Sequence, residues 1–106
     1  MSENDYAHHR VDLQDFNPKD WCIVDIRDAQ SYEEAHLKDA IHLNDLEAIR
    51  EFALAHPKHK ILLQCRIGRS AAHYASLLHE AGLENVYFLK ACVEDFEAHG
   101  LEMVRA

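Results

Sequence analysis

Short apolar runs recur along this chain and alternate with segments of helical periodicity. Most of these runs lie between polar or turn-forming residues, as buried strands do. They predict strands at residues 21–26, 40–43, 60–64 and 86–89, with 60–64 as the central strand. Residues 11–16 are partly apolar, and their pattern leaves both strand and helix open.

Helical periodicity is clearest in the segments that follow the second and third of these runs. Two of the expected helices open on a capping-box pattern, in which a polar residue precedes a glutamate by three positions. Proline or glycine residues, which end helices, follow three of them. The four helices are expected from Ser31, from Asn44 to Ala55 before Pro57, over 71–81 before Gly82, and over 93–99 before Gly100.

The alternation of strands and helices predicts an α/β fold, with a mostly parallel sheet and helices on both faces. Parallel neighbours need crossover connections, and helices usually provide them. Glycine and proline are scarce and no linker interrupts the pattern, so residues 10–106 are expected to form one domain. Residues 1–9 are expected to be a frayed terminus.

Cys65 stands at the carboxyl end of the expected central strand, where ligands bind in such sheets. It opens the loop Cys65-Arg66-Ile67-Gly68-Arg69-Ser70. Backbone N–H groups where the next helix begins can converge on an anion, and the two arginines add positive charge. Thiols in such surroundings ionise more readily than free thiols. The pattern predicts a nucleophilic cysteine; a buried cysteine with a purely structural role is the alternative.

Composition narrows the range of partners. The chain has 19 acidic and 11 basic residues and a formal net charge of −8, which argues against nucleic acid as a partner. The loop arginines then form a local positive region that suits a small anion. No apolar stretch reaches the ~18 residues of a membrane span, and the acidic start lacks the features of a secretory signal. We therefore expect no membrane association and a cytoplasmic location.

The cysteines number three and include no CxxC pair, and this odd count excludes a disulfide framework and a four-cysteine zinc site. The nine histidines are scattered, and the close pairs among them are typical of a solvated surface. We expect no metal and no cofactor. Cys22 lies in the most apolar run and is expected in the core.

Several stretches, taken in order and spacing, resemble the single-domain rhodaneses, a family of sulfurtransferases. They are residues 24–28, 32–37, 40–43, 65–70 and 81–87, and the resemblance runs from about residue 11 to residue 104. It implies one rhodanese-like domain in which Cys65 accepts a sulfur atom and becomes a persulfide. The loop residues Arg66, Ile67, Gly68, Arg69 and Ser70 would bind the donor, an anion such as thiosulfate or a protein persulfide. The acceptor would be a thiol, or cyanide in an assay.

Three positions depart from the family pattern. Ser70 stands where arginine is common, Ala91-Cys92 replaces paired glycines, and Phe96 replaces a tryptophan. These changes leave the physiological donor and acceptor open, and the oligomeric state is open as well. Cys92 is either a small buried residue at a helix start or a thiol that resolves the persulfide by forming a disulfide.

Two other functions fit part of the pattern. A non-catalytic binding module of the same fold fits the domain, but such modules usually lack the loop cysteine. A phosphatase of the related fold fits a cysteine in an anion-binding loop, but it needs an arginine six residues later, where this chain has Ala71. Asp25 and Arg27 are expected to form an ion pair that braces the loops, with a catalytic role as the alternative.

Overall fold

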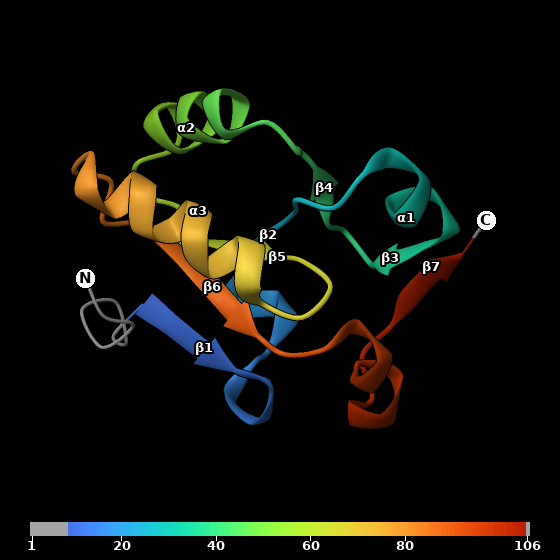
Figure 1. The fold of residues 1–106 in the computed structure, drawn as a ribbon. Helices are drawn as coiled ribbons and strands as arrows, with labels where there is room; N and C mark the ends of the chain where they lie inside the picture. Colours follow the sequence, from blue (N-terminus) through green and yellow to red (C-terminus); the bar gives the residue numbers. More distant parts are fainter. Residues whose placement is uncertain (1–8, 106) are drawn as a thin grey trace.

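The computed structural model describes residues 9–105, and its centre is a five-stranded sheet in the order β1-β6-β5-β2-β4 (Figure 1). Every neighbouring pair in this sheet is parallel. The α/β class expected from the sequence is confirmed, and the run at 60–64 forms the middle strand. The strands are β1 (Arg10–Asp12), β2 (Cys22–Asp25), β4 (Ile41–His42), β5 (Ile61–Gln64) and β6 (Val86–Lys90).

The central strand β5 is buried along its whole length. Its apolar residues, from Ile61 to Leu63, have no exposed surface. A parallel strand covered on both faces reads as a continuous apolar run, because both sets of side chains enter a core. This explains why the apolar run alone identified the strand.

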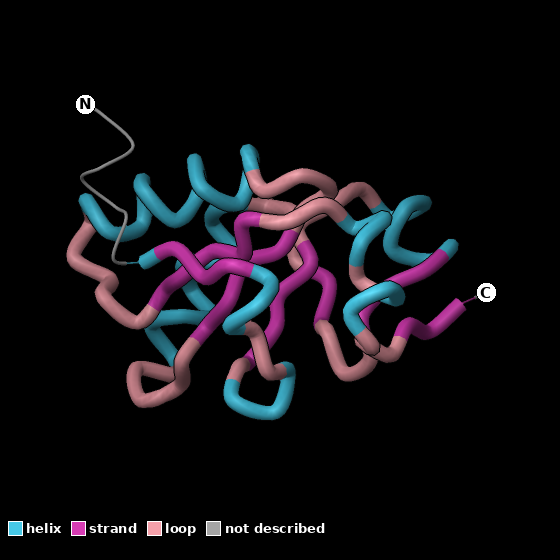
Figure 2. The backbone as a smooth tube through the Cα atoms, turned by 90° about the horizontal axis from the view of Figure 1, so that it is seen from below, coloured by secondary structure: helices cyan, strands magenta, loops and turns pink. Residues whose placement is uncertain are grey.

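One face of the sheet is covered by α2 (Leu46–Ala55) and α3 (Arg69–Glu80). Ile49 of α2 and Ala75 of α3 belong to the same buried core as Leu63 of β5. Figure 2 shows α3 along one side of the strands and short helical turns on the other side. None of the helices within residues 9–105 is long and apolar enough to cross a membrane.

The opposite face carries a second core, covered by short 3₁₀ helices and a pair of strands. Phe16 and Phe96 pack there against Leu62 of the central strand. The expected last α-helix over 93–99 is replaced by two 3₁₀ helices, Val93–Asp95 and Glu97–His99. So short a segment gains little from α-helix formation, and 3₁₀ turns still bury Phe96 fully.

A second sheet of two strands was not expected from the sequence. β3 (Ala35–Leu37) pairs antiparallel with β7 (Met103–Arg105), near the carboxyl end of the described chain. β3 follows directly after α1 (Ala29–Glu34). Each strand has only three residues, and their pairing joins distant parts of the chain, so neither leaves a local signal.

Both predicted capping boxes were wrong in detail. α1 begins at Ala29, with Asp28 as its N-cap, so Ser31 lies inside the helix. α2 is capped by Asp45, whose carboxylate accepts a hydrogen bond from the Ala48 N–H at 3.1 Å. Neighbouring polar residues offer alternative caps, and the packing of the apolar face decides between them.

The expected frayed terminus is wrong at His9, the first described residue. His9 is 5% exposed, and its ring lies 5.0 Å from that of Tyr87 in β6. The rest of that prediction concerns residues 1–8, which lie outside the described part of the chain.

The cap of α2 can be tested with two adjacent substitutions. Asp45→Ala should lower the free energy of unfolding by about 1 kcal/mol, because an N-terminal N–H of the helix loses its acceptor. Asn44→Ala, the control, should change it by less than about 0.5 kcal/mol. Urea unfolding of both variants measures the difference. Equal losses of unfolding free energy would contradict the assignment of Asp45 as the N-cap.

Candidate active site

The loop between β5 and α3 holds the sulfur of Cys65 with backbone N–H groups. The Gly68 N–H lies 3.1 Å from Cys65 Sγ, and the Ala71 N–H lies 3.4 Å from it. Both donors belong to the start of α3, whose N-cap is Gly68. The sulfur therefore sits where the helix dipole and converging N–H groups favour negative charge. Cys65 is 6% exposed.

Gly68 is required by this geometry for two separate reasons. Its φ of +94° lies in the left-handed region, which side chains disfavour. A Cβ atom at this position would also lie 3.1 Å from the Leu89 carbonyl oxygen and 3.2 Å from Lys90 Cα. The turn is thus pressed against the end of β6, and this contact holds the loop over the sheet.

Other N–H groups of the loop remain available to a ligand. No residue within 9–105 accepts a hydrogen bond from the backbone N–H of Arg66, Ile67, Arg69 or Ser70. The Val93 N–H donates to the Arg66 carbonyl at 2.9 Å, which ties the loop to the segment after β6. The loop can therefore surround an anion attached to Cys65 with unused donors.

Cys65 opens into a cleft of about 1000 Å³. The loop forms one part of its lining. A second part of the lining, opposite the loop, comes from the end of β2 and from α1. A third part comes from the segment that follows β6 in the chain. The lining residues are Ile26, Arg27, Asp28, Ser31, Glu34, Ala35, Cys65, Arg66, Ile67, Arg69, Ser70, Val93 and Glu94.

The two loop arginines are in different electrostatic states. Arg66 Nε lies 3.6 Å from Glu94 Oε1, and both side chains are mostly exposed. Arg69 has no ion-pair partner in the described part of the chain. Arg69 is therefore the cation of the loop whose charge is not offset by a neighbouring carboxylate.

Negative charge lies on the facing part of the lining, at Asp28 and Glu34. The Ser31 hydroxyl, with smaller contributions from backbone N–H groups and Arg27, keeps the pKa of Asp28 below its ordinary value. The Asp28 carboxylate therefore stays ionised at neutral pH. An anionic ligand is favoured on the loop side of the cleft and disfavoured beside α1.

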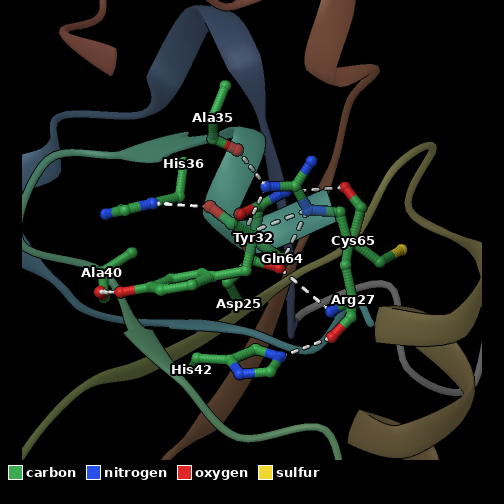
Figure 3. A network of polar contacts seen from close by, with 9 residues as sticks. All are labelled: Asp25, Arg27, Tyr32, Ala35, His36, Ala40, His42, Gln64 and Cys65. Carbon is green, nitrogen blue, oxygen red and sulfur yellow. Dashed lines mark hydrogen bonds and ion pairs between the residues drawn. The ribbon is translucent and has the colours of Figure 1, made fainter. Parts of the chain in front are cut away.

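The expected Asp25–Arg27 pair is present, buried, and serves to brace the site (Figure 3). Asp25 has no exposed surface, and its Oδ2 lies 2.7 Å from Arg27 Nη2. The same guanidinium donates to the Ala35 carbonyl at 2.6 Å, which joins the end of β2 to the start of β3. Since Asp25 and Ala35 occupy this guanidinium, it is not an additional cation for a ligand.

A stack of aromatic rings packs beside the Asp25–Arg27 pair. The Tyr32 ring lies 3.9 Å from that of His36 and 4.8 Å from that of His42. His42 Nε2 donates to the Arg27 carbonyl at 2.6 Å, and the Tyr32 hydroxyl donates to the Ala40 carbonyl at 2.7 Å. His36 Nδ1 donates to the Tyr32 carbonyl at 2.7 Å, so both histidines are engaged in structural hydrogen bonds.

Of the three cysteines, Cys65 is the one that lines the cleft. Cys22 packs against the core on the α2 and α3 face, and burial raises the pKa of its thiol. All three cysteines are free thiols in the structure. A disulfide between Cys65 and Cys92, formed when the persulfide is resolved, stays a prediction. No group of three or more metal-binding side chains occurs among residues 9–105.

The sequence did not identify the part of the lining that faces the loop. Asp28, Ser31 and Glu34 were not assigned to the site, and neither was Glu94. One signal was available for Asp28, because it closely follows a buried strand, and parallel sheets bind ligands at such strand ends. Glu94 had no local signal, since its place beside Arg66 depends on the contact between two loops.

Comparisons with known proteins agree with this geometry. A family model described as a rhodanese-like domain matches residues 6–99. The thiosulfate sulfurtransferase GlpE of Coxiella burnetii is 37% identical over 82 residues, which cover 76% of each protein. GlpE of Actinobacillus pleuropneumoniae is 30% identical over 84 residues, covering 79% of this chain and 78% of that protein.

Among solved structures, the solution structure of protein hp1203 from Helicobacter pylori is similar over most of the chain. Its TM-score is 0.88 at 37% sequence identity, and the match covers 94% of this chain and 92% of that one. Together the family model and these relatives support a sulfurtransferase activity in general terms.

A side chain at Gly68 would cost stability both through its contact with β6 and through its left-handed backbone, and a control variant separates these two costs. Gly82 has a similar φ of +92°, but no atom lies within 4 Å of the place where its Cβ would stand, so Gly82→Ala is the matched control. Gly82→Ala should cost about 1 kcal/mol of unfolding free energy from the left-handed backbone alone. Gly68→Ala should cost at least about 1 kcal/mol more, because the methyl group meets β6. Equal losses in thermal or urea unfolding would show that the contact with β6 does not matter.

Proposed function

The chain belongs to the family of rhodanese-like domains, and we propose that it is a thiosulfate-type sulfurtransferase that carries sulfane sulfur on Cys65. One observation carries this proposal: two backbone N–H groups converge on Cys65 Sγ at the start of α3, inside an open cleft. That arrangement suits a site that must hold an anion in both states of the cycle, first as the Cys65 thiolate and then as the persulfide.

In the first step, the Cys65 thiolate attacks the outer sulfur of thiosulfate. A new S–S bond forms to Cys65, the S–S bond of thiosulfate breaks, and sulfite leaves with the electron pair. The enzyme is left as an anionic persulfide, and no external oxidant or reductant is needed. Thiolate attack on a sulfur–sulfur bond follows the general course of thiol–disulfide exchange.

In the second step, an acceptor nucleophile attacks the outer sulfur of the persulfide. A thiolate acceptor becomes a persulfide, or cyanide becomes thiocyanate, and the Cys65 thiolate leaves. Because the thiolate of Cys65 is both the attacking group of the first step and the leaving group of the second, the two transfer steps themselves move no proton. This agrees with histidines that are engaged in structural hydrogen bonds.

The loop stabilises both anionic states of Cys65. The N–H groups of Gly68 and Ala71 serve the inner sulfur, and the unused donors from Arg66 to Ser70 suit the outer sulfur. Charge at a helix N-terminus is stabilised by roughly 0.3–1 kcal/mol, or about 2 kcal/mol when partly buried. Arg69, and Arg66 less strongly, would attract the anionic donor.

The partners follow from the same chemistry. The donor is a small sulfur-bearing anion such as thiosulfate, or a protein persulfide, and the acceptor is a thiol. A net charge of −8 argues against nucleic acid. A reducing compartment such as the cytoplasm suits a cycle that needs Cys65 as a free thiolate, and no cofactor takes part in the proposed steps.

A phosphatase activity is less well supported. The position six residues after Cys65 is Ala71, which has no exposed surface and uses its N–H on the sulfur. No arginine can clamp a phosphate from there. A non-catalytic module is disfavoured by the cysteine itself, and parallel assays of sulfur transfer and phosphate release separate the three functions.

Sulfur loading tests the central proposal. Wild-type protein mixed with thiosulfate should gain one sulfur atom, on Cys65, by intact-protein and peptide mass spectrometry. Cys65→Ser should gain none and should lose transferase activity, while Cys22→Ser keeps both if it folds. Sulfur found on Cys22 or Cys92 in the Cys65→Ser variant, together with retained activity, would refute the assignment.

Donor binding tests the two arginines separately. Arg69→Gln should raise the KM for thiosulfate about fivefold, which corresponds to the ~1 kcal/mol expected of an exposed charge. Arg66→Gln should raise it less, because Glu94 already offsets that charge. Transfer from the persulfide to the acceptor should slow less than donor binding in both variants.

Arg50→Gln is the matched control, because Arg50 pairs with Glu47 on α2 and does not line the cleft. Steady-state kinetics at low and moderate salt measure the effects. An unchanged KM in both loop variants would leave these arginines as surface charge.

A further inference from the structure

Gln64 is a buried polar residue, and one of its two amide atoms has no hydrogen-bond partner in the described chain. It is the last residue of β5, is 1% exposed, and pairs in register with Asp25 of β2. Its side chain shares the sheet face on which Leu62 packs into the second core, since alternate residues of a strand share a face. An apolar residue of similar size would fill this position without the cost of burying an amide.

The Gln64 amide makes one hydrogen bond, and its partner is the cysteine proposed to carry the sulfur. Nε2 donates to the Cys65 carbonyl oxygen at 2.8 Å. No residue in the described chain donates to the other amide atom, Oε1. The orientation of the amide follows from the bond, because a carbonyl accepts only from the NH₂ group. The amide is therefore oriented toward Cys65 and is not part of a satisfied core network.

This bond determines the direction of the next peptide group. The described chain has no cis peptide bond, so the Cys65 carbonyl and the Arg66 N–H point in opposite directions. Figure 3 shows the Cys65 carbonyl oxygen and the Cys65 sulfur pointing to different sides of the residue. With the carbonyl held by buried Gln64, the Arg66 N–H points away from the second core. It has no acceptor in residues 9–105.

We infer that Gln64 is a positioning residue for sulfur transfer: by holding the Cys65 carbonyl, it turns the Arg66 N–H toward the outer sulfur of the Cys65 persulfide. This inference rests on the proposed function. Gln64 does not touch the substrate and acts through the Cys65–Arg66 peptide. Without its amide, the peptide can rotate and the Arg66 N–H is no longer fixed as a donor to the transferred sulfur.

The test replaces the amide with an apolar side chain of the same length. Gln64→Met should slow single-turnover sulfur loading from thiosulfate about fivefold, the usual effect of one hydrogen bond. The apparent binding constant of thiosulfate should change less than about twofold, because the loop arginines are intact. The melting temperature should not fall by more than about 4 °C, because a half-satisfied buried amide is also removed.

Leu62→Met is the matched control, on the same strand and the same face but without a polar contact to Cys65. Its loading rate should match that of the wild type. Loading rates that are equal in Gln64→Met and the wild type would overturn the inference. So would a loss in Leu62→Met as large as that in Gln64→Met, because packing alone would then explain it.

A spectroscopic measurement can overturn the inference on wild-type protein alone, even if Gln64→Met does not fold. In ¹H–¹⁵N correlation spectra, the Arg66 amide proton should shift downfield when the free thiol is converted into the persulfide. In a folded Gln64→Met variant this shift should be smaller or absent. An Arg66 amide signal that does not move in the wild type would overturn the inference.

Failure of the proposed function has a different signature. If wild-type protein takes up no sulfur from thiosulfate, the proposed donor is wrong, whatever Gln64 does. Inorganic polysulfide can then be used to form the persulfide by the same thiolate attack, with a shorter polysulfide as the leaving group. The Arg66 amide shift, compared between wild-type protein and Gln64→Met after this treatment, tests Gln64 independently of the donor.

Discussion

The site depends on one close approach, between the left-handed turn at Gly68 and the end of β6. The turn reverses the chain within a few residues of β5, so that the first N–H groups of α3 face back toward Cys65. A side chain at this position would lie against Leu89 and Lys90, push the turn away from the sheet and move those donors off the sulfur. The chemistry proposed at Cys65 thus relies on a backbone contact that involves no functional side chain.

The opposite side of the cleft depends on a buried charge pair. Asp25 is fully buried, and its partner Arg27 also holds the Ala35 carbonyl. Removing one partner would leave an uncompensated charge in the interior, which costs far more than an exposed pair is worth. The pair therefore fixes the positions of α1 and β3 relative to the end of β2. The acidic residues of the cleft lining on α1 are positioned with them. The cleft gains a basic side and an acidic side from two unrelated structural causes.

This division of charge limits where a charged ligand can approach the cleft. The protein as a whole is acidic, with a net charge of −8, and the loop carries its positive charge at Arg66 and Arg69. Glu94 offsets part of that charge from the segment after β6, which is tied to the loop by the Val93 N–H. The positive charge of the cleft is thus confined to a small region, which suits the small anionic donor proposed for this site rather than a polyanion.

The sequence by itself determined the central strand, the Cys65 loop and the α/β class, because each is encoded by neighbouring residues. A continuous apolar run predicts a strand covered on both faces, and a cysteine, two arginines and a glycine in one loop predict an anion site. Only the tertiary structure decided which residues face that loop. The place of Glu94 and the β3–β7 pairing depend on contacts between distant segments, which leave no local pattern. The cap at Asp45 depends on a choice between adjacent polar residues. The bond from Gln64 to the neighbouring Cys65 depends on a side-chain orientation that the sequence does not specify. Packing, and not periodicity, selects among them.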